Sequence, residues 1–410
     1  MKRHTVSALH GCDLVGTLWG SSGAALALRQ ALATALHRPP EALWLTGAGR
    51  GALHAFVRAT QRQPDDEALL PGYTCVVVPN VFLHVGVSVR YVDIAAEGVN
   101  PSPDAWAQAI TPRTRWVVWP HNFGVPSAGI AALRARFPQV LFIEDAAHAW
   151  GSCHADGSPV GTHGHAAFFS FEYSKCLTTG LGGALLVNEP ALRPAVAEAL
   201  APQHALSLKT QVKVLMTLAY HLMLATWPST LASGLTALLR APSRALGLVA
   251  ATRPAELSGQ AQPDYLQALP DCLARLALPQ LARMPQVLAL RRQQARHYTE
   301  ALAGSPWLTP LGAAEPATLL RFPLRVAHPA QREALHAGLR ALDIEPGIWF
   351  DDVVHPAGSL RHGYTEGDCP NGERLARCIV NLPLGLHARL SQRQWQGLRR
   401  LAQTPPEITG

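Results

Sequence analysis

The feature that most constrains the fold is a pair of apolar, strand-like runs that each lead to a reactive side chain. Residues 140–143 lead to Glu144 and Asp145, and residues 166–171 lead to Lys175. Ligands of open α/β sheets bind beyond the carboxyl ends of the strands. If the two strands are neighbours, the carboxylate of Asp145 and the amine of Lys175 therefore face one ligand.

This pairing of a lysine with an acid suggests pyridoxal phosphate (PLP) as the cofactor. PLP needs a lysine amine for its Schiff base and a carboxylate that keeps its pyridine nitrogen protonated. The chain has 35 Lys and Arg together, and only Lys2, Lys175, Lys209 and Lys213 are lysines. Where arginine is the usual cation, Lys175 indicates a need for a nitrogen that can lose its proton. The alternative, a solvated loop lysine, fits its glycine-rich, apolar setting poorly.

The same stretch resembles the DegT/StrS family of sugar aminotransferases, which are fold-type I PLP enzymes. The family pattern has an acidic pair, two small residues, Gln or His and then a Gly. Ser-Phe, three residues and the Schiff-base lysine follow later. The segments EDAAHAWG and SFEYSK match this pattern, TTGLGGALLVN resembles its continuation, and the likeness extends from about Leu43 to Ala402.

The resemblance implies a role for each matching residue. Asp145 would pair with the pyridine nitrogen, and His148 would lie near the phenolic oxygen. Ser170 would bind the phosphate. Lys175 would be the Schiff-base lysine and the proton shuttle of the reaction.

A glycine-rich turn at residues 47–51 follows a short apolar strand and precedes an amphipathic helix. Glycines let backbone N–H groups approach an anion, and the helix N-terminus adds partial positive charge. The resemblance implies that Gly47, Ala48 and Gly49 lie at the PLP phosphate. Without the family, GAGRG alone would indicate no more than a turn.

The ring-stacking group is left open by the sequence. In PGYTCVVVPN the family position that often holds a ring-covering aromatic is Cys75. Tyr73 and His121 are candidates to replace it, although a tyrosine in this setting is more often a packing residue. By resemblance, His121 and His355 lie on the substrate side of the site. Asp351, Asp352 and His355 also form an acidic and imidazole cluster, but one short cluster rarely makes a metal site, and we expect no metal.

Strands and helices alternate from residue 67 to residue 188, which predicts an α/β fold with a largely parallel sheet covered on both faces. We expect a fold-type I PLP-dependent transferase with a mixed, mostly parallel sheet in a large domain, residues 1–262. This domain includes an N-terminal arm and an apolar insertion at about residues 201–262. Residues 263–410 then form the interdomain helices and a smaller C-terminal α/β domain. Many relatives place an Asn before the crossover helix, where it reaches the partner subunit's phosphate, and Ala268 stands near that position.

Composition narrows the class of ligand and the compartment. Hydrophobic residues make up 48% and charged residues 15% of the chain, which indicates a well-buried globular protein. The net charge of +7 favours an anionic ligand, and without a Lys/Arg block a phosphorylated small molecule fits better than nucleic acid. Seven cysteines without a CxxC pair predict a reducing cytoplasm, with neither a disulfide framework nor a zinc site. The N-terminal segment breaks its apolar run too early for a secretory signal.

The run Val214–Leu239 has 26 residues without Asp, Glu, Lys or Arg. Its length would allow a membrane span. Pro228 interrupts it, however, and cations flank both ends, which favours two short helices in an interfacial hairpin or a subunit contact. We therefore expect a homodimer, with residues 214–239 either adding to the dimer or docking peripherally at the inner membrane.

The resemblance implies an aminotransferase that moves an amino group from glutamate or glutamine to a keto sugar carried on a nucleotide. Such a step serves the biosynthesis of surface polysaccharides, glycolipids or antibiotic sugars. One alternative is a PLP-dependent sugar dehydratase, but the related dehydratases lack the Schiff-base lysine. A non-catalytic regulator or a membrane-docked scaffold is the other alternative. It is motivated by Cys75, Ala268 and the uncharged run.

Overall fold

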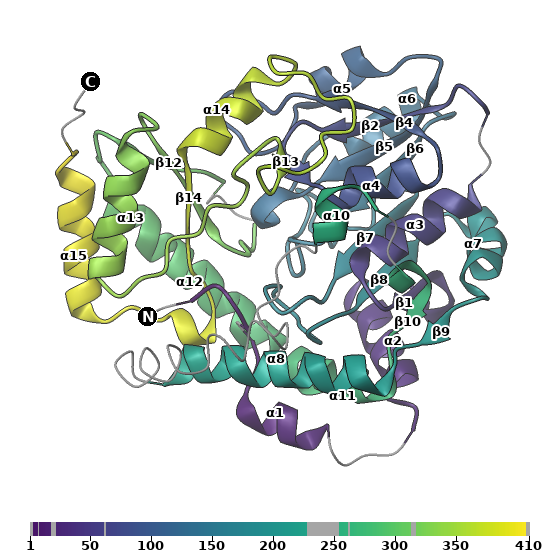
Figure 1. Ribbon diagram of the computed structural model, residues 1–410, viewed down its shortest axis with the longest axis horizontal. Helices are drawn as coiled ribbons and strands as arrows, with labels where there is room; N and C mark the ends of the chain where they lie inside the picture. The colour runs from purple at the N-terminus through teal and green to yellow at the C-terminus, as the bar shows by residue number, and fades with distance from the viewer. Residues whose placement is uncertain are drawn as a thin grey trace.

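The computed structural model describes residues 3–6, 8–17, 22–60, 63–227, 254–260, 263–312 and 317–406 (Figure 1). A seven-stranded sheet in the order β1-β8-β7-β6-β5-β2-β4 forms its centre. Strands β4, β2, β5, β6 and β7 pair in parallel, whereas β8 is antiparallel to both β7 and β1. The predicted α/β fold with a mixed, mostly parallel sheet is confirmed. The strand bounds are β1 Leu43–Thr46, β2 Glu67–Pro71, β4 Ser88–Val92, β5 Thr114–Pro120, β6 Leu141–Asp145, β7 Ala166–Ser170 and β8 Gly183–Val187.

Helices cover both faces of this sheet because alternate strand residues point to opposite sides. Ala166 and Phe168 of β7 join one apolar cluster, and Ala167 and Phe169 join the other. On the first face lie α3 (Gly49–Ala59), α4 (Val77–His84) and α7 (Arg193–Leu200). On the second lie α2 (Ala24–Ala35), α8 (Leu208–Thr226), α11 (Asp271–Ala282), α5 (Pro103–Ala109) and α6 (Ile130–Arg136).

The long helix α12 (Met284–Leu302) connects two hydrophobic cores. Its first turns place Met284 and Val287 in the core of the large sheet, and its last turns place Tyr298 and Leu302 in a second core. That second core covers a three-stranded antiparallel sheet in the order β11-β12-β14. The elements are β11 Leu308–Pro310, β12 Phe322–Val326, β14 Ile379–Leu382, α13 Gln331–Ala341 and α15 Gln392–Gln403. In Figure 1, α13 and α15 lie on the opposite side of the molecule from α7.

The C-terminal part also returns to the large sheet. Strand β13 (Val354–His355) pairs in parallel with β3 (Thr74–Cys75), which places His355 opposite Cys75. Helix α14 (Pro370–Cys378) begins at the carboxylate of Asp93, which accepts hydrogen bonds from the backbone of Asn371 and Gly372. These contacts bring residues from both ends of the sequence to the carboxyl ends of the parallel strands.

Short elements complete the described chain. They are α1 Gly11–Gly16, α10 Pro254–Leu257, the two-residue pair β9 His204–Ala205 and β10 Gln267–Ala268, and 3-10 segments at Pro40–Ala42, Asn122–Gly124, Pro190–Leu192, Pro263–Leu266 and Leu386–Ala388.

The uncharged run begins inside α8, which is a single continuous helix up to Thr226 rather than the first of two short ones. Val214, Leu218 and Leu222 of this helix pack into the core. Residues 228–253, which include Pro228 and the end of the run, lie outside the described residues. Within the described residues, no helix combines the length and the apolar character that a membrane crossing requires.

Candidate active site

Asp145 and Lys175 both lie at the carboxyl ends of neighbouring parallel strands. Asp145 is the last residue of β6, and its partner in the register is Phe168 of β7. β7 continues to Ser170, and Lys175 follows in the next loop, where its N–H donates to the carbonyl of Glu172 (2.9 Å). The charges of Asp145 and Lys175 act on each other. The structure therefore brings the predicted acid and amine together.

The amine of Lys175 is prepared to act as a nucleophile. Burial lowers its pKa, and the positive charge of Arg321 adds to this, although the charges of Glu172, Cys75 and Asp145 oppose it. In the described part of the chain its Nζ has no hydrogen bond or ion pair. A lysine whose charged form is disfavoured is unprotonated for a larger fraction of the time than a solvent-exposed lysine, so its lone pair is more often available.

Asp145 is a carboxylate with room for a cationic partner. Burial raises its pKa to about 6, while the hydrogen bond from the N–H of Ala147 to its Oδ1 (3.1 Å) and the charge of Lys175 oppose that rise. Its Oδ2 has no hydrogen bond within the described residues. A protonated ring nitrogen would fill this vacancy with a charge-assisted hydrogen bond.

His148 is fixed in one tautomer. The backbone N–H of Phe123 donates to its Nδ1 (3.3 Å), and its ring stacks with those of Phe123 and Phe350. Burial holds its pKa well below the usual value, with the charges of Lys175, Arg321 and His355 adding to the effect. The neutral ring therefore carries its proton on Nε2, which can donate to an oxyanion.

Gly49 and Ser170 lie against each other at the start of α3. A Cβ on Gly49 would stand 3.0 Å from the carbonyl oxygen of Phe169 and 3.1 Å from the Cβ of Ser170, so any other residue would require these neighbours to shift. The Oγ of Ser170 has no hydrogen bond to the described residues. A helix N-terminus beside a free hydroxyl is suited to a phosphate.

The other residues of the turn are used differently. The N–H of Gly47 donates to the carbonyl oxygen of Gln267 (2.5 Å), and Ala48 is the N-cap of α3. Ala268, which follows Gln267, is in β10 beside this turn. The cofactor roles of Gly47 and Ala48 remain predictions.

Cys75 and Tyr73 lie in different surroundings. The Cys75 thiol is near Lys175 and Asp145, whose charges act on it, and burial raises its pKa. Tyr73 is fully buried, and its hydroxyl donates to the carbonyl of Phe350 and accepts from the same residue's N–H, both at 2.9 Å. The ring of Tyr73 packs edge-on against Phe350. Whether Tyr73 or His121 covers the pyridine ring in place of an aromatic at Cys75 remains a prediction.

His355 lies at the border between the two cores, next to the site. Its Nδ1 is 2.6 Å from the Oδ1 of Asp351, and its ring packs beside Phe350. Because β13 is paired with β3, His355 adjoins Cys75 and influences the pKa of His148. A substrate role for His355 remains a prediction that this position suits.

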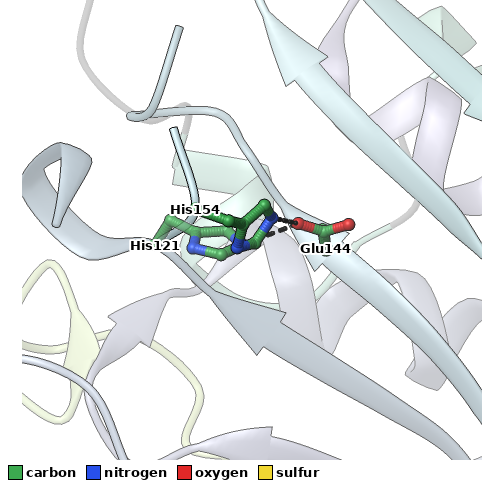
Figure 2. A group of neighbouring side chains, drawn as sticks. All are labelled: His121, Glu144 and His154. Atoms are coloured by element: carbon green, nitrogen blue, oxygen red, sulfur yellow. Dashed lines mark hydrogen bonds and ion pairs between the residues drawn. The ribbon is translucent and has the colours of Figure 1, made fainter. Parts of the chain in front are cut away.

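His121 lies in a separate buried cluster around Glu144 (Figure 2). The Nε2 atoms of His121 and His154 are each 3.0 Å from Oε2 of Glu144. The backbone N–H groups of Gly161, His163 and Gly164 also donate to the two carboxylate oxygens. Burial alone would raise the pKa of Glu144, but the hydrogen bonds from the histidines hold it well below the usual value.

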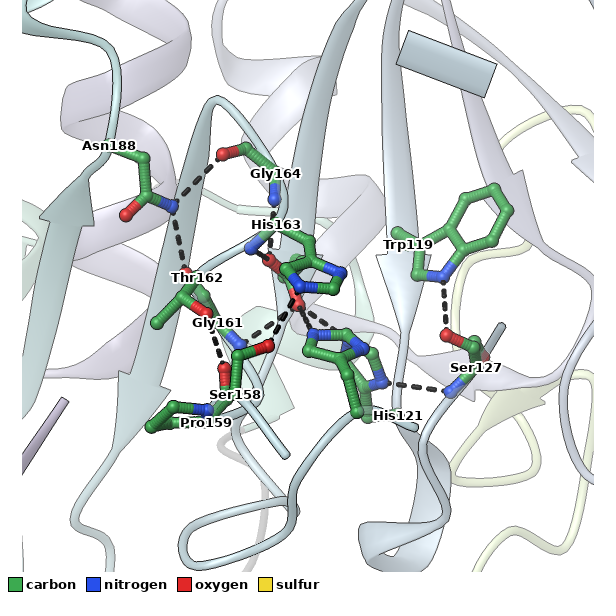
Figure 3. Close-up of polar contacts among 12 residues, drawn as sticks. Trp119, His121, Ser127, Ser158, Pro159, Gly161, Thr162, His163, Gly164 and Asn188 are labelled. Carbon is green, nitrogen blue, oxygen red and sulfur yellow. Dashed lines mark hydrogen bonds and ion pairs between the residues drawn. The ribbon is translucent and has the colours of Figure 1, made fainter. Parts of the chain in front are cut away.

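These three side chains also have the spacing of a metal site, but the hydrogen bonds argue against one. The N–H of Ser127 donates to Nδ1 of His121 (3.0 Å), as Figure 3 shows. That nitrogen must therefore be unprotonated, so the proton is on Nε2, the atom that a metal would need. Both ring nitrogens of His121 are occupied, and its predicted substrate role remains untested.

Sequence reasoning missed Arg321, which immediately precedes β12. Its charge influences the pKa of both Lys175 and His148. The available signal was a lone arginine after apolar residues in the segment TLLRFPL, within the predicted C-terminal α/β domain.

The residues present fit PLP. An acid with a free oxygen, a half-buried lysine with a lowered pKa and a fixed imidazole donor lie near one another. The N-terminus of α3 at Gly49 and a serine hydroxyl without a hydrogen-bond partner in the described chain can receive a phosphate. The donor set therefore matches the aromatic nitrogen, aldehyde, phenolic oxygen and phosphate of that cofactor.

Comparisons with known proteins agree with this fit to PLP. The sequence model of the DegT/DnrJ/EryC1/StrS aminotransferase family matches residues 23–218 and 251–396. Among solved structures, the fold is similar to the aminotransferase TlmJ from Streptoalloteichus hindustanus (TM-score 0.71, 22% identity, 98% of this chain and 97% of that chain). It is also similar to the PLP form of the putative sugar aminotransferase Spr1654 from Streptococcus pneumoniae (0.71, 19%, 97% and 97%). A third similar structure is PseC from Helicobacter pylori, an aminotransferase involved in the biosynthesis of pseudoaminic acid (0.70, 17%, 98% and 98%).

Proposed function

The chain belongs to the DegT/DnrJ/EryC1/StrS aminotransferase family, whose members depend on PLP, and we propose which residues carry the reaction and which substrates it uses. The proposed reaction transfers an amino group from glutamate or glutamine to the keto group of a nucleotide-linked sugar. The observation that carries the proposal is the half-buried Lys175, with its lowered pKa, beside Asp145 at the carboxyl ends of β7 and β6.

Each residue has a task that follows from its surroundings. When bound, PLP supplies an electron sink that stabilises negative charge on the carbon next to the transferred nitrogen. Lys175 would hold the cofactor, and its Nζ would take and return the proton of that carbon. Asp145 would keep the pyridine nitrogen protonated. His148 would donate from Nε2 to the phenolic oxygen, and Ser170 with Gly49 would hold the phosphate.

The substrate class rests on similarity and charge. PseC is described as acting in pseudoaminic acid biosynthesis and Spr1654 as a putative sugar aminotransferase, which supports a keto sugar as acceptor. The net charge of +7 suits an acceptor that carries nucleotide phosphates. The proposed amino-sugar product serves the biosynthesis of a surface polysaccharide, a glycolipid or an antibiotic sugar.

Two partners are proposed, a second copy of the chain and a membrane surface. We infer a homodimer, as the resemblance implies, in a reducing compartment that suits seven free cysteines. We also infer peripheral membrane contact through α8. Leu208, Val212 and Met216 are 74%, 48% and 46% exposed and recur every four residues along that helix. Lys209 and Lys213 flank this stripe, which is the pattern of an interfacial helix.

The test is substitution of Lys175. We expect Lys175→Ala to lower turnover by about 10³-fold or more, because no second lysine lies in the motif region to replace the proton carrier. It should also abolish the absorbance of the lysine-linked cofactor, while the circular dichroism spectrum is unchanged. Lys209→Ala on the exposed surface of α8 is the matched control. Turnover of Lys175→Ala within tenfold of the wild type would sink the assignment.

The two alternative functions, a dehydratase and a non-catalytic regulator or scaffold, predict different products and different absorbance spectra. A PLP-dependent dehydratase would release water from the sugar and leave the donor unconsumed, whereas the proposed reaction forms one 2-oxo acid per amino sugar. A non-catalytic regulator or a membrane scaffold would show no cofactor absorbance after incubation with PLP. Either result would replace the proposed function.

A further inference from the structure

The inner face of helix α8 packs against the loop that carries Lys175. Val214, Leu218 and His221 follow one another at spacings of four and three residues, so they lie on one side of the helix. The exposed stripe of the same helix lies on the opposite side. Helix α8 therefore separates the surface of the large domain from this loop.

The first contact between α8 and the loop is a ring stack. The ring centroids of His221 and Tyr173 are 4.5 Å apart, and the two ring planes are inclined by only 15°. Tyr173 lies two residues before Lys175, in the loop that follows β7. The carbonyl oxygen of Tyr173 accepts a hydrogen bond from the N–H of Val6 (2.9 Å). Both the ring and the backbone of Tyr173 are thus held by segments outside the loop.

The second contact lies near the other end of the loop, at Gly180. Gly180 has a φ of +80°, and a Cβ on it would stand 2.5 Å from Cγ1 of Val214 and 3.0 Å from Cδ1 of Leu218. There is no space for a side chain between them. The loop backbone therefore rests directly on α8 at this point.

Hydrogen bonds within the loop connect the two contacts to Lys175. The N–H of Lys175 donates to the carbonyl oxygen of Glu172, and the N–H of Thr179 donates to that of Phe171, both at 2.9 Å. Closely packed, hydrogen-bonded segments transmit displacements because they have little free volume. A shift at either contact with α8 is therefore transmitted to Lys175.

We propose that α8 positions the loop of Lys175, with His221 as a positioning residue that acts through the ring of Tyr173. The inference rests on the proposed function, in which Lys175 holds the cofactor, and deepens it. The Nε2 of His221 is buried without a hydrogen-bond partner, so the face of the ring rather than this nitrogen makes the contact. Burial lowers the pKa of His221 to about 4, with the charge of Arg3 adding to the effect, so the ring is neutral at neutral pH. What the loop requires from this position is a flat, uncharged ring.

The test measures the amine of Lys175 in the full-length, cofactor-free protein. The protein is acetylated with a trace of acetic anhydride at a series of pH values, and mass spectrometry gives the pH at which the labelling of Lys175 is half-maximal. Lys209 and Lys213 on α8 are internal references in the same samples. Hydrogen–deuterium exchange of residues 171–182 is the second measurement.

The variants separate the ring stack from general effects on folding. His221→Ala removes the stack from the side of α8, and Tyr173→Ala removes it from the side of the loop. Their double variant completes the cycle, and His221→Phe restores a flat ring without the imidazole nitrogens. His204→Ala, which changes the same residue type on the exposed strand β9, is the matched control.

We expect His221→Ala to raise the labelling midpoint of Lys175 by about 1 pH unit, because a loosened loop lets water reach an amine whose pKa burial now lowers. Exchange of the loop amides should become about 3- to 10-fold faster. Tyr173→Ala should give the same shift, and the double variant should exceed neither single variant. His221→Phe and His204→Ala should match the wild type, and the two reference lysines should not change.

An unchanged midpoint of Lys175 in His221→Ala would overturn the proposal even if the free energy of unfolding fell, because a merely structural contact affects stability alone. Additive shifts in the double variant would also overturn it, as would a His221→Phe variant that behaves like His221→Ala. If His221→Ala fails to fold, His221→Leu decides, because leucine fills the space but offers no flat ring.

The failure of this inference can be distinguished from failure of the proposed function. A midpoint that depends on His221, in a protein whose turnover survives Lys175→Ala, would leave the positioning role in place and remove the catalytic assignment. The opposite pair of results would keep the assignment of Lys175 and remove the role of α8.

Discussion

At the scale of single residues, Asp145 has a charge that depends on pH within the working range. Burial raises its pKa to about 6, so the cofactor-free protein loses this negative charge as the pH falls below that value. Binding to a protonated pyridine nitrogen needs the carboxylate. We therefore expect PLP affinity to be constant above about pH 7 and to fall progressively below pH 6, measured by fluorescence titration.

Asp145→Asn is the control for that profile, because the cofactor's own groups titrate equally in both proteins. The variant should bind PLP more weakly by about 1.5–3 kcal/mol at neutral pH, the usual contribution of a hydrogen bond to a charged group. The difference between the two curves should disappear at low pH. A constant difference from pH 5 to pH 8 would mean that another acid pairs with the ring.

Glu144, the neighbour of Asp145, has a structural rather than a chemical task. We expect Glu144→Gln to lower the free energy of unfolding by about 3 kcal/mol or more, because an amide NH₂ would face N–H donors that the carboxylate now accepts. The measurement is urea unfolding, with Glu198→Gln on the exposed surface as the control.

The lowered pKa of Glu144 sets how its contribution to stability depends on pH. This contribution is fully present above the pKa of glutamate in the unfolded chain, about 4.3, and is lost as the pH falls toward the lower pKa of Glu144 in the folded protein. Wild type and Glu144→Gln should therefore converge in stability as the pH falls below about 4. Equal stabilities at pH 7 would contradict the central place of Glu144 in this cluster.

At the scale of elements, strands were predictable where an apolar run ended in a polar residue. Residues 140–143 and 166–171 correspond to β6 and β7, within two residues at each end. The pairing of β13 with β3, which places His355 at the site, was not predictable, because two-residue strands have no periodicity and their partner is 280 residues away in register. The same holds for Arg321, since Lys175 and His148, whose pKa values it influences, lie in distant segments of the sequence.

Helix α8 shows that an uncharged run of sequence does not by itself reveal whether its residues pack in the core or lie on the surface. One face of the helix packs Val214, Leu218 and Leu222 into the core, and the first two would lie against any Cβ added to Gly180. Deletion of residues 212–240 would remove this packing as well as the surface stripe. A test of the stripe must therefore change only its exposed side chains.

The matched variant is the triple substitution Leu208→Gln, Val212→Gln and Met216→Gln. We expect it to lose sedimentation with vesicles that contain anionic lipid and to keep the wild-type circular dichroism spectrum, because only exposed side chains are changed. Wild-type binding should weaken at high salt, as Lys209 and Lys213 contribute about 1 kcal/mol each near an anionic surface. Unchanged sedimentation of the variant would mean that α8 does not dock.

At the scale of the whole molecule, the proposed phosphate end of the site is short of positive charge among the described residues. The groups proposed to bind there are the N-terminus of α3 at Gly49 and the hydroxyl of Ser170, while Arg50 of the same turn forms an ion pair with Glu256 at 3.0 Å. Ala268 offers no polar atom in its side chain where many relatives have an asparagine that crosses to the other subunit. A phosphate dianion at Gly49 thus calls for donors from a second copy of the chain.

We therefore expect a homodimer with a mass of about twice the 44.0 kDa of the chain in light scattering. Because each site would be completed across the interface, dilution that separates the subunits should also release PLP. Fluorescence anisotropy reports subunit dissociation, and cofactor fluorescence reports PLP release. Measured on the same samples, the two processes should be half complete at the same protein concentration. The α8 triple variant should remain dimeric, since we assign its stripe to the membrane. A monomer that keeps both PLP and full activity on dilution would contradict the shared site and would require the chain itself to supply the missing phosphate donors.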